Sequence, residues 1–461
     1  MTLITSISGI RGTIGGSSGE GLTPPDIVKF SSAYAQWLRE STGEQAPTVV
    51  LGRDARISGL MVAQLVTGTL CGSGVHVIDI GLATTPTVEM AVPGMKADGG
   101  IILTASHNPR QWNALKLLNS KGEFLSAADG ERIVGLVEGG AFSYSQVDEL
   151  GKYHAREGMD DFHIDRVLAL PLVDTERIRS AGFRVAIDCV NSVGGVILPE
   201  LLKKLGVSEV IELYTEPSGE FPHNPEPLPE NLEAIAKLVK EKKADVGFVV
   251  DPDVDRLAIV CEDGSMFGEE YTLVAVADYV LQRTPGSTCT NLSSSRALAD
   301  VTQKHGGEHF ASAVGEVNVV EMMKAKDCVI GGEGNGGVIY PALHYGRDAL
   351  VGIALFLSHL AHSGSGCTAL KRRYPSYSII KNKIPLEAGT DIDRILEELE
   401  KKYAGERLNT IDGLKIDMEQ GWVHLRKSNT EPIIRIYAEA ATAEEAEAMA
   451  AGVMQKVQEV K

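Results

Sequence analysis

Ser106 follows an apolar run of the sequence and stands directly before a histidine. The run at residues 100–103, Gly-Ile-Ile-Leu, stops at the hexapeptide Thr-Ala-Ser-His-Asn-Pro at residues 104–109. An apolar run that ends at small polar residues and a proline predicts a buried strand followed by a tight turn. The turn would present the Ser106 hydroxyl at the end of a sheet, with the imidazole of His107 beside it. This arrangement suits a covalent carrier of a phosphoryl or acyl group, although a turn with a capping hydroxyl is the alternative.

Three aspartates alternate with other residues in the segment Asp-Pro-Asp-Val-Asp-Arg at residues 251–256. Alternate side chains of an extended chain point to one side, so the oxygens of Asp251, Asp253 and Asp255 could converge on one hard cation. We expect this cation to be Mg²⁺, with a phosphate of the substrate or the enzyme completing its shell. A solvated acidic turn is the alternative, and it is disfavoured because three carboxylates this close repel one another without a cation.

An EF-hand is a second alternative for the acidic segment, since Glu262 falls at the twelfth position counted from Asp251. Two features oppose it. Arg256 stands where the EF-hand loop needs glycine, and the flanking residues 247–250 and 257–260 resemble strands rather than helices.

A glycine-rich segment, Gly-Gly-Glu-Gly-Asn-Gly-Gly, occupies residues 331–337. Glycines let the backbone approach a ligand closely, while Glu333 offers an acceptor and Asn335 both a donor and an acceptor. Neighbouring sugar hydroxyls need this combination, so we expect a sugar-binding loop. A phosphate-cradling loop is disfavoured because it lacks the P-loop lysine and carries a carboxylate, and a flexible loop remains the alternative.

A basic segment, Arg-Lys-Ser-Asn-Thr-Glu-Pro, lies at residues 426–432, with another arginine soon after it. Guanidinium, hydroxyl and backbone N–H groups together make an anion site, and a charged turn is the alternative. The candidate phosphate-binding residues are Arg426, Ser428, Asn429, Thr430 and Arg435. Arg11 and Lys116 could each contribute a further cation, although lone basic residues are usually surface charges.

The composition indicates an ordinary soluble enzyme. The net charge of -18 argues against a nucleic-acid partner, which would need clustered lysine and arginine. The six cysteines are widely separated and fit reduced thiols rather than zinc or a disulfide framework. No segment has the pattern of a membrane span or a signal peptide, so we expect a cytoplasmic protein. We also expect it to be a monomer or a homodimer.

The elements that must position these residues alternate between short β-branched runs and longer helical stretches, which predicts βαβ units. A chain of 461 residues is too long for one core. We expect an α/β protein with three similar mixed-sheet domains and a smaller C-terminal α+β domain that contains an antiparallel sheet. The expected domains are residues 1–155 with the serine turn, 156–260 ending in the acidic segment, 261–370 with the glycine-rich loop, and 371–461 with the basic segment.

In combination and in this order, the motifs resemble those of the α-D-phosphohexomutases. The resemblance covers essentially the whole chain and includes Ser-Gly-Ile-Arg-Gly at residues 8–12 and Thr-Glu-Pro at 430–432. It implies the four-domain architecture of that family and a phosphomutase of the isomerase class. Such an enzyme interconverts hexose 6-phosphate and hexose 1-phosphate through a phosphoserine and a hexose 1,6-bisphosphate.

By this resemblance, Ser106 is the phosphoserine and contributes to the Mg²⁺ site with Asp251, Asp253 and Asp255. Arg11 and Lys116 would shuttle the hydroxyl proton, supported by His107. Three further residues match positions that contact the sugar: Glu333, Asn335 and Arg256. The candidate phosphate-binding residues named above match the site of the phosphate that does not react.

The sequence also departs from the family. The sugar loop lacks the histidine of many bacterial members, and His344 or Arg347 could replace it. Asn429 stands where glycine is usual, and residues 313–317 look most like phosphoglucosamine mutases and archaeal-type members. We therefore expect glucosamine 6-phosphate as substrate. The alternatives are a broad phosphoglucomutase/phosphomannomutase, a metal-dependent sugar-phosphate phosphatase, and a silent sugar-phosphate binder.

Overall fold

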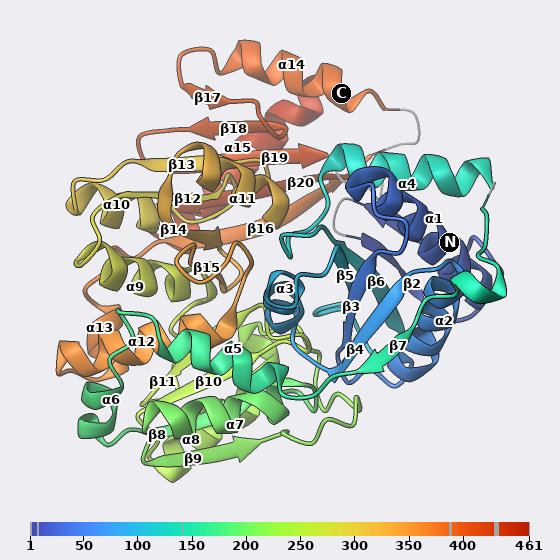
Figure 1. Ribbon diagram of the computed structural model, residues 1–461. Coiled ribbons are helices and arrows are strands. Elements are labelled where there is room, and N and C mark those ends of the chain that lie inside the picture. Colours follow the sequence, from blue (N-terminus) through green and yellow to red (C-terminus); the bar gives the residue numbers. More distant parts are fainter. Residues whose placement is uncertain (1, 7–8, 141, 387–389, 428–432, 461) are drawn as a thin grey trace.

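The protein folds into four successive units, each built on its own sheet (Figure 1). The computed structural model describes residues 2–6, 9–140, 142–386, 390–427 and 433–460. In Figure 1 the first unit, in blue, lies on the right, the C-terminal unit in red lies at the top, and the second unit in green lies at the bottom. No helix within the described ranges is long and apolar enough to cross a bilayer.

The first unit is a mixed sheet in the strand order β1-β2-β6-β5-β3-β4-β7, in which β3, β4, β5 and β7 run parallel. Helices cover both faces, because α1, α2 and α4 pack on one side and α3 on the other. The elements are β1 (Ile4–Ser6), β2 (Gly9–Thr13), α1 (Pro24–Thr42), β3 (Thr48–Arg53), α2 (Gly59–Gly72), β4 (His76–Leu82), α3 (Thr85–Gly94), β5 (Gly99–Leu103), β6 (Trp112–Leu118), α4 (Ala127–Gly139), η1 (Val147–Glu149) and β7 (Tyr153–Ala155). The serine turn therefore connects the buried strand β5 to β6.

The second unit is a sheet in the order β11-β10-β8-β9, and only the β10–β11 pair is antiparallel in this described part of the chain. Helix α8 covers one face and α7 packs on the other. The elements are α5 (Met159–Leu168), α6 (Thr175–Ala181), β8 (Arg184–Asp188), α7 (Gly194–Leu205), β9 (Glu209–Leu213), η2 (Pro229–Asn231), α8 (Glu233–Lys242), β10 (Val246–Val250) and β11 (Leu257–Cys261). The acidic segment forms the connection between β10 and β11.

The third unit is a sheet in the order β13-β12-β14-β15, again closed by an antiparallel pair, β14 and β15. The glycine-rich loop connects this pair, just as the acidic segment connects β10 and β11. The elements are α9 (Glu269–Leu281), β12 (Ser287–Asn291), α10 (Ala297–Lys304), β13 (His309–Ser312), α11 (Glu316–Ala325), β14 (Cys328–Glu333), β15 (Gly337–Ile339), α12 (Ala349–Ser363) and α13 (Cys367–Lys371). The second and third units share one continuous apolar core, in which α9 and α12 are central.

The fourth unit is smaller and antiparallel, with strand order β16-β20-β19-β18-β17. Helices α14 and α15 pack on the sheet in a separate core. The elements are β16 (Ser378–Pro385), α14 (Ile392–Lys402), β17 (Arg407–Asn409), β18 (Leu414–Asp417), β19 (Gly421–Lys427), β20 (Ile433–Ala440) and α15 (Ala443–Val460). This architecture confirms the predicted fold class, with three mixed α/β units and a smaller antiparallel one.

Candidate active site

One cavity of about 830 Å³ is lined by residues from all four units. Its volume lies in the range of small-molecule sites. It brings together most of the site residues that the sequence predicts, namely Arg11, Ser106, His107, Lys116, Arg256, Glu333, Asn335, Arg426 and Arg435. The predicted residues Ser428, Asn429 and Thr430 lie outside the described residues.

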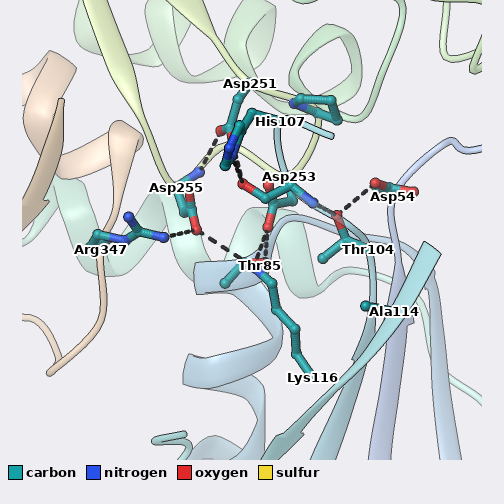
Figure 2. Close-up of polar contacts among 12 residues, drawn as sticks. Asp54, Thr85, Thr104, His107, Ala114, Lys116, Asp251, Asp253, Asp255 and Arg347 are labelled. Carbon is teal, nitrogen blue, oxygen red and sulfur yellow. Dashed lines mark hydrogen bonds and ion pairs between the residues drawn. The ribbon is translucent and has the colours of Figure 1, made fainter. Parts of the chain in front are cut away.

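Ser106 occupies a turn with an unusual backbone at the edge of this cavity. Its φ of 49° lies in the left-handed region, which a residue other than glycine adopts at a cost. The side-chain hydroxyl of Ser106 donates a hydrogen bond of 2.7 Å to Oδ2 of Asp251, and lies 3.4 Å from Nδ1 of His107. The serine turn of the first unit therefore meets the acidic segment of the second unit (Figure 2).

A buried arginine holds the serine turn in this conformation. Arg56 is 1% exposed, and its Nε lies 3.0 Å from Oδ2 of Asp54. Its guanidinium donates to the backbone carbonyl groups of Ser106, Asn108, Pro109 and Trp112. The hydroxyl of Thr104 also donates to Asp54, at 2.7 Å, and accepts the backbone N–H of Ser106 at 2.9 Å. These bonds satisfy the polar groups of the turn and fix the direction of the Ser106 side chain.

The surroundings of His107 favour its neutral form. Burial, together with the positive charges of Arg256, Arg11 and Arg347, lowers the pKa of His107 to about 2. The positive field that keeps His107 neutral is also the field that would attract a phosphate group.

The three aspartates converge as predicted, but not for the predicted reason. Asp251, Asp253 and Asp255 are fully buried, and one carboxylate oxygen of each lies within 4.8 Å of the others. The connection between β10 and β11 is a turn rather than an extended chain, and Val254 within it has a φ of 63°. The backbone N–H groups of Asp255 and Arg256 donate to Oδ1 of Asp251, at 3.2 and 3.1 Å. The turn, and not the alternation of a strand, therefore gathers the carboxylates.

The aspartates retain oxygen atoms that could bind a metal. Lys116 Nζ lies 2.7 Å from Oδ2 of Asp253, and the hydroxyl of Thr85 donates to the same oxygen at 2.6 Å. Arg347 Nη2 lies 2.6 Å from Oδ2 of Asp255. The Oδ1 atoms of Asp253 and Asp255 are buried and have no hydrogen-bond partner among the described residues. Unpaired buried carboxylate oxygens are costly by themselves and are the ligands that a hard divalent cation prefers, so the triad fits such a cation.

The electrostatics of the triad lead to the same conclusion. Burial, and then the charges of Asp255 and Asp253, raises the pKa of Asp251 well above its ordinary value. Burial also disfavours the charge of Asp253, but Lys116 outweighs this effect and the pKa of Asp253 is lowered. A divalent cation would favour the ionised form of all three side chains.

The glycine-rich loop places Glu333 and Asn335 on the wall of the same cavity. Glu333 accepts hydrogen bonds from the side chain of Asn291 at 2.8 Å and the backbone of Gly315 at 3.2 Å, and Arg347 Nη1 donates to it at 2.9 Å. This network fixes the Glu333 carboxylate at the cavity surface, where it can accept hydrogen bonds from hydroxyl groups.

The two residues considered as replacements for the missing loop histidine differ in position. His344 lies 3.5 Å from Glu89 and 3.3 Å from Asp348, and is not among the residues that line the cavity. Arg347 lines the cavity and is buried among Asp255, Glu316 and Glu333. Of the two, Arg347 is therefore the one at the site.

Arg426 and Arg435 face each other across the β19–β20 pair, in which they are direct partners in the register. Like charges at opposed positions are unfavourable in a sheet, so this pair favours an anion between them. Arg426 also lies 2.8 Å from Asp412, which offsets part of its charge.

Sequence reasoning missed several residues that support the site. Arg56 follows β3 by a few residues, Thr85 likewise follows β4, and Asn291 ends β12. The other site residues also lie at strand ends, so the positions of Arg56, Thr85 and Asn291 could have indicated a place in the site. The partners of these residues come from distant parts of the chain, and no local pattern marks such pairings.

Family models match nearly the whole chain. Those for the phosphoglucomutase/phosphomannomutase alpha/beta/alpha domains I, II and III match residues 3–143, 161–264 and 268–377, and the C-terminal domain matches residues 383–456.

Individual relatives also match nearly the whole chain. A "phosphoglucomutase/phosphomannomutase" of Thermococcus kodakarensis is 35% identical over 441 residues, which cover 94% of this chain and 95% of the relative. A "probable phosphoglucosamine mutase" of Methanopyrus kandleri is 33% identical over 444 residues, covering 95% and 94%. The crystal structure of a phosphoglucomutase/phosphomannomutase family protein from Burkholderia thailandensis has a TM-score of 0.85 at 26% identity, and covers 99% of this chain and 98% of that one. The chain therefore belongs to the phosphoglucomutase/phosphomannomutase family and is a phosphomutase of the isomerase class.

Proposed function

We propose that this enzyme interconverts hexose 6-phosphate and hexose 1-phosphate through a phosphorylated Ser106 and a bound hexose 1,6-bisphosphate, and that its preferred substrate is glucosamine 6-phosphate. The observation that carries the proposal is the hydrogen bond of 2.7 Å from Ser106 to Asp251. It sets the Ser106 hydroxyl between a buried acidic triad and a cavity that Arg426 and Arg435 also line.

Asp251, Asp253 and Asp255 would hold Mg²⁺ together with an oxygen of the phosphorylated Ser106. When bound, this ion offsets the charge of the phosphoryl group as the group passes between oxygens. The unpaired Oδ1 atoms of Asp253 and Asp255 support this assignment.

During transfer, the bond between phosphorus and Ser106 Oγ breaks while a bond forms to the sugar hydroxyl, and a proton passes from that hydroxyl to Ser106 Oγ. Lys116 and Arg11 are proposed to relay this proton, and His107 supports them. Arg11 lines the cavity and donates to Asn108 of the serine turn at 2.9 Å. Burial lowers the pKa of Arg11, which makes transient loss of its proton less costly than at a surface.

Two further groups of residues are proposed to bind the substrate, one at the sugar and one at the phosphate that does not react. Glu333, Asn335 and Arg256 are proposed to contact the sugar, and Arg426 and Arg435 the phosphate that does not react. After the first transfer the bisphosphate turns end for end, so that either phosphate can occupy either position.

The preference for an amino sugar is supported by the wall of the cavity next to the glycine-rich loop, where the backbone of Gly315 donates to Glu333. Residues 314–317, Val-Gly-Glu-Val, line the cavity and belong to the segment that resembles phosphoglucosamine mutases. The name of the Methanopyrus kandleri relative agrees with this preference. The second candidate is a broad phosphoglucomutase/phosphomannomutase, which the name of the Thermococcus kodakarensis relative favours.

The test uses hexose 1,6-bisphosphate labelled in the phosphate. We expect one label per chain on Ser106, which then moves to glucosamine monophosphate, whereas Ser106→Ala should acquire no label and lose turnover by several orders of magnitude. Retained activity in Ser106→Ala would contradict the covalent mechanism. Release of inorganic phosphate without formation of the isomer would instead indicate a phosphatase. Rates for glucosamine, glucose and mannose phosphates would decide between the two candidate substrate ranges.

A further inference from the structure

Four glutamates line the active-site cavity, and three of them are close to a cation. Glu316 lies 3.1 Å and Glu333 lies 2.9 Å from the guanidinium of Arg347. Glu226 lies 3.7 Å from Arg256, and its side chain is 35% exposed. The fourth, Glu270, has no cation within ion-pair distance among the described residues.

Glu270 lies in the first turn of α9, in contact with the glycine-rich loop. Its Oε2 accepts the backbone N–H of Ser295 at 2.8 Å. A Cβ atom built on Gly334 would lie 2.0 Å from Oε2 of Glu270, so the carboxyl group is in contact with the backbone of this glycine. Gly334 is the residue between Glu333 and Asn335, so Glu270 lies beside the two proposed sugar contacts.

The charge of Lys381 lowers the pKa of Glu270, but this cation is paired with another glutamate. Lys381 also lines the cavity, but its Nζ lies 2.8 Å from Oε1 of Glu269. Burial raises the pKa of Glu270 well above its ordinary value, and the charges of Glu269 and Glu439 add to this effect. A carboxyl group in such a place is costly to ionise in the free enzyme, and a cation brought by the ligand would offset this cost.

The other charged side chains of the cavity include several cations, which suit anions. Arg11, Lys116, Arg256 and Arg347 all line the cavity, and each would repel a positively charged substituent. A neutral hydroxyl group could occupy the position beside Glu270, but it would not favour the carboxylate form. An ammonium group would pair with it.

We propose that Glu270 is a specificity-determining residue that binds the C2 ammonium group of a 2-amino-2-deoxyhexose phosphate. This inference rests on the proposed mutase function and identifies the group that would select the amino sugar. It is distinct from the contacts of Glu333 and Asn335, which serve hydroxyl groups that glucose and glucosamine phosphates share.

The first test compares kcat/KM for glucosamine 6-phosphate and glucose 6-phosphate in Glu270→Gln. Glutamine keeps an acceptor for Ser295 but removes the charge, so the value for the amino sugar should fall about 10- to 100-fold, the range of a charge-assisted hydrogen bond. The value for glucose 6-phosphate should change less than about threefold, because a neutral hydroxyl needs no charged partner. The matched control is Glu233→Gln, which makes the same change in the first turn of α8, at an exposed residue that is not among those lining the active-site cavity. This control should leave the ratio of the two kcat/KM values unchanged.

The second test measures proton release on binding and does not depend on turnover. In Ser106→Ala, titration calorimetry in buffers of different ionisation enthalpy should detect a proton released when glucosamine 6-phosphate binds, because the ammonium group makes Glu270 ionise. Glucose 6-phosphate should release less, and adding Glu270→Gln should abolish the difference.

The outcomes separate this inference from the proposed function. If the wild-type enzyme converts glucose but not glucosamine phosphate, the proposed substrate is wrong. If it converts glucosamine phosphate, but Glu270→Gln lowers both kcat/KM values equally and proton release is the same for both sugars, then Glu270 is only structural and the inference is overturned. Should the variant not fold, the calorimetric comparison of the two sugars in Ser106→Ala still decides.

Discussion

Arg347 Nη2 lies 2.6 Å from Oδ2 of Asp255, and this contact joins the sugar-binding side of the cavity to the acidic triad. The same guanidinium lies 2.9 Å from Glu333 and 3.1 Å from Glu316. These charges outweigh the effect of burial, so the pKa of Arg347 is raised and it stays charged. Figure 2 shows the contact of Arg347 with Asp255. Arg347 therefore couples the position of the triad to that of the proposed sugar contact Glu333.

Arg347→Lys tests this coupling. Lysine keeps the charge but cannot reach three carboxylates with a planar fork, so we expect kcat/KM to fall about 10- to 100-fold. Arg347→Met should in addition lower the free energy of unfolding by about 3–5 kcal/mol, because it leaves buried carboxylates unpaired. Kinetics and urea denaturation measure the two effects. Arg110→Lys, at an ion pair whose side chains are 61% exposed, is the control and should change neither. Wild-type kinetics in Arg347→Lys would argue against the coupling.

Metal binding should appear as added stability. At a Mg²⁺ concentration of 100 times Kd, the ion should add about 2.7 kcal/mol to the free energy of unfolding of the wild-type protein. Asp253→Asn should lose most of this increment, because one ligand loses its charge while its volume is kept. The increment is compared within each variant, since the substitution also removes the partner of Lys116.

Asp263→Asn is the matched control for this measurement, because Asp263 is an exposed carboxylate in the turn after β11. It should keep the full increment. A Mg²⁺ increment that survives in Asp253→Asn would show that the ion binds elsewhere. Activity should be lost in excess chelator and return with Mg²⁺.

The anion site is tested by removing one of the opposed arginines. Arg435→Ala should raise KM for the hexose monophosphate by about 10- to 100-fold, the loss of a charge-assisted hydrogen bond. It should not destabilise the protein, because it also removes the repulsion between Arg426 and Arg435 across the sheet. Lys427→Ala, which removes an exposed lysine 3.5 Å from Asp393, is the control and should leave KM unchanged. An unchanged KM in Arg435→Ala would mean that the phosphate binds elsewhere.

The sequence predicted the elements that carry the site, because buried strands that end in polar loops have a strong local signature. The strand expected at residues 100–103 is β5, and the strands expected at residues 247–250 and 257–260 are β10 and β11. Arg56 and Arg347 show what could not be predicted. Their partners lie in other turns or other units, and only the folded chain brings them together.

The acidic segment shows a different limit. The sequence identified Asp251, Asp253 and Asp255, but the alternation that suggested convergence assumed an extended chain. The structure gathers them in a turn with a positive φ at Val254, a conformation that β-branched residues rarely adopt and that their type therefore does not suggest.

A pH dependence of stability should arise at Asp160 in the first turn of α5, which is not among the residues lining the cavity. Burial raises the pKa of Asp160 from 3.8 to about 6. The folded protein therefore binds this proton more tightly than the unfolded chain does. The resulting stabilisation is fully present below the unfolded pKa and is lost as the pH rises through about 6. Asp160→Asn cannot ionise, so it should gain stability relative to the wild-type protein as the pH rises over this range.

We expect this relative gain to level off near about 1–2 kcal/mol above pH 6, less than the shift alone would give because the side chain is partly exposed. Urea denaturation at a series of pH values measures it. Asp161→Asn is the control at the neighbouring position, where the carboxylate lies 2.8 Å from Lys204, and it should show no such gain. A constant difference between Asp160→Asn and the wild-type protein across the whole pH range would mean that Asp160 ionises normally in the folded protein.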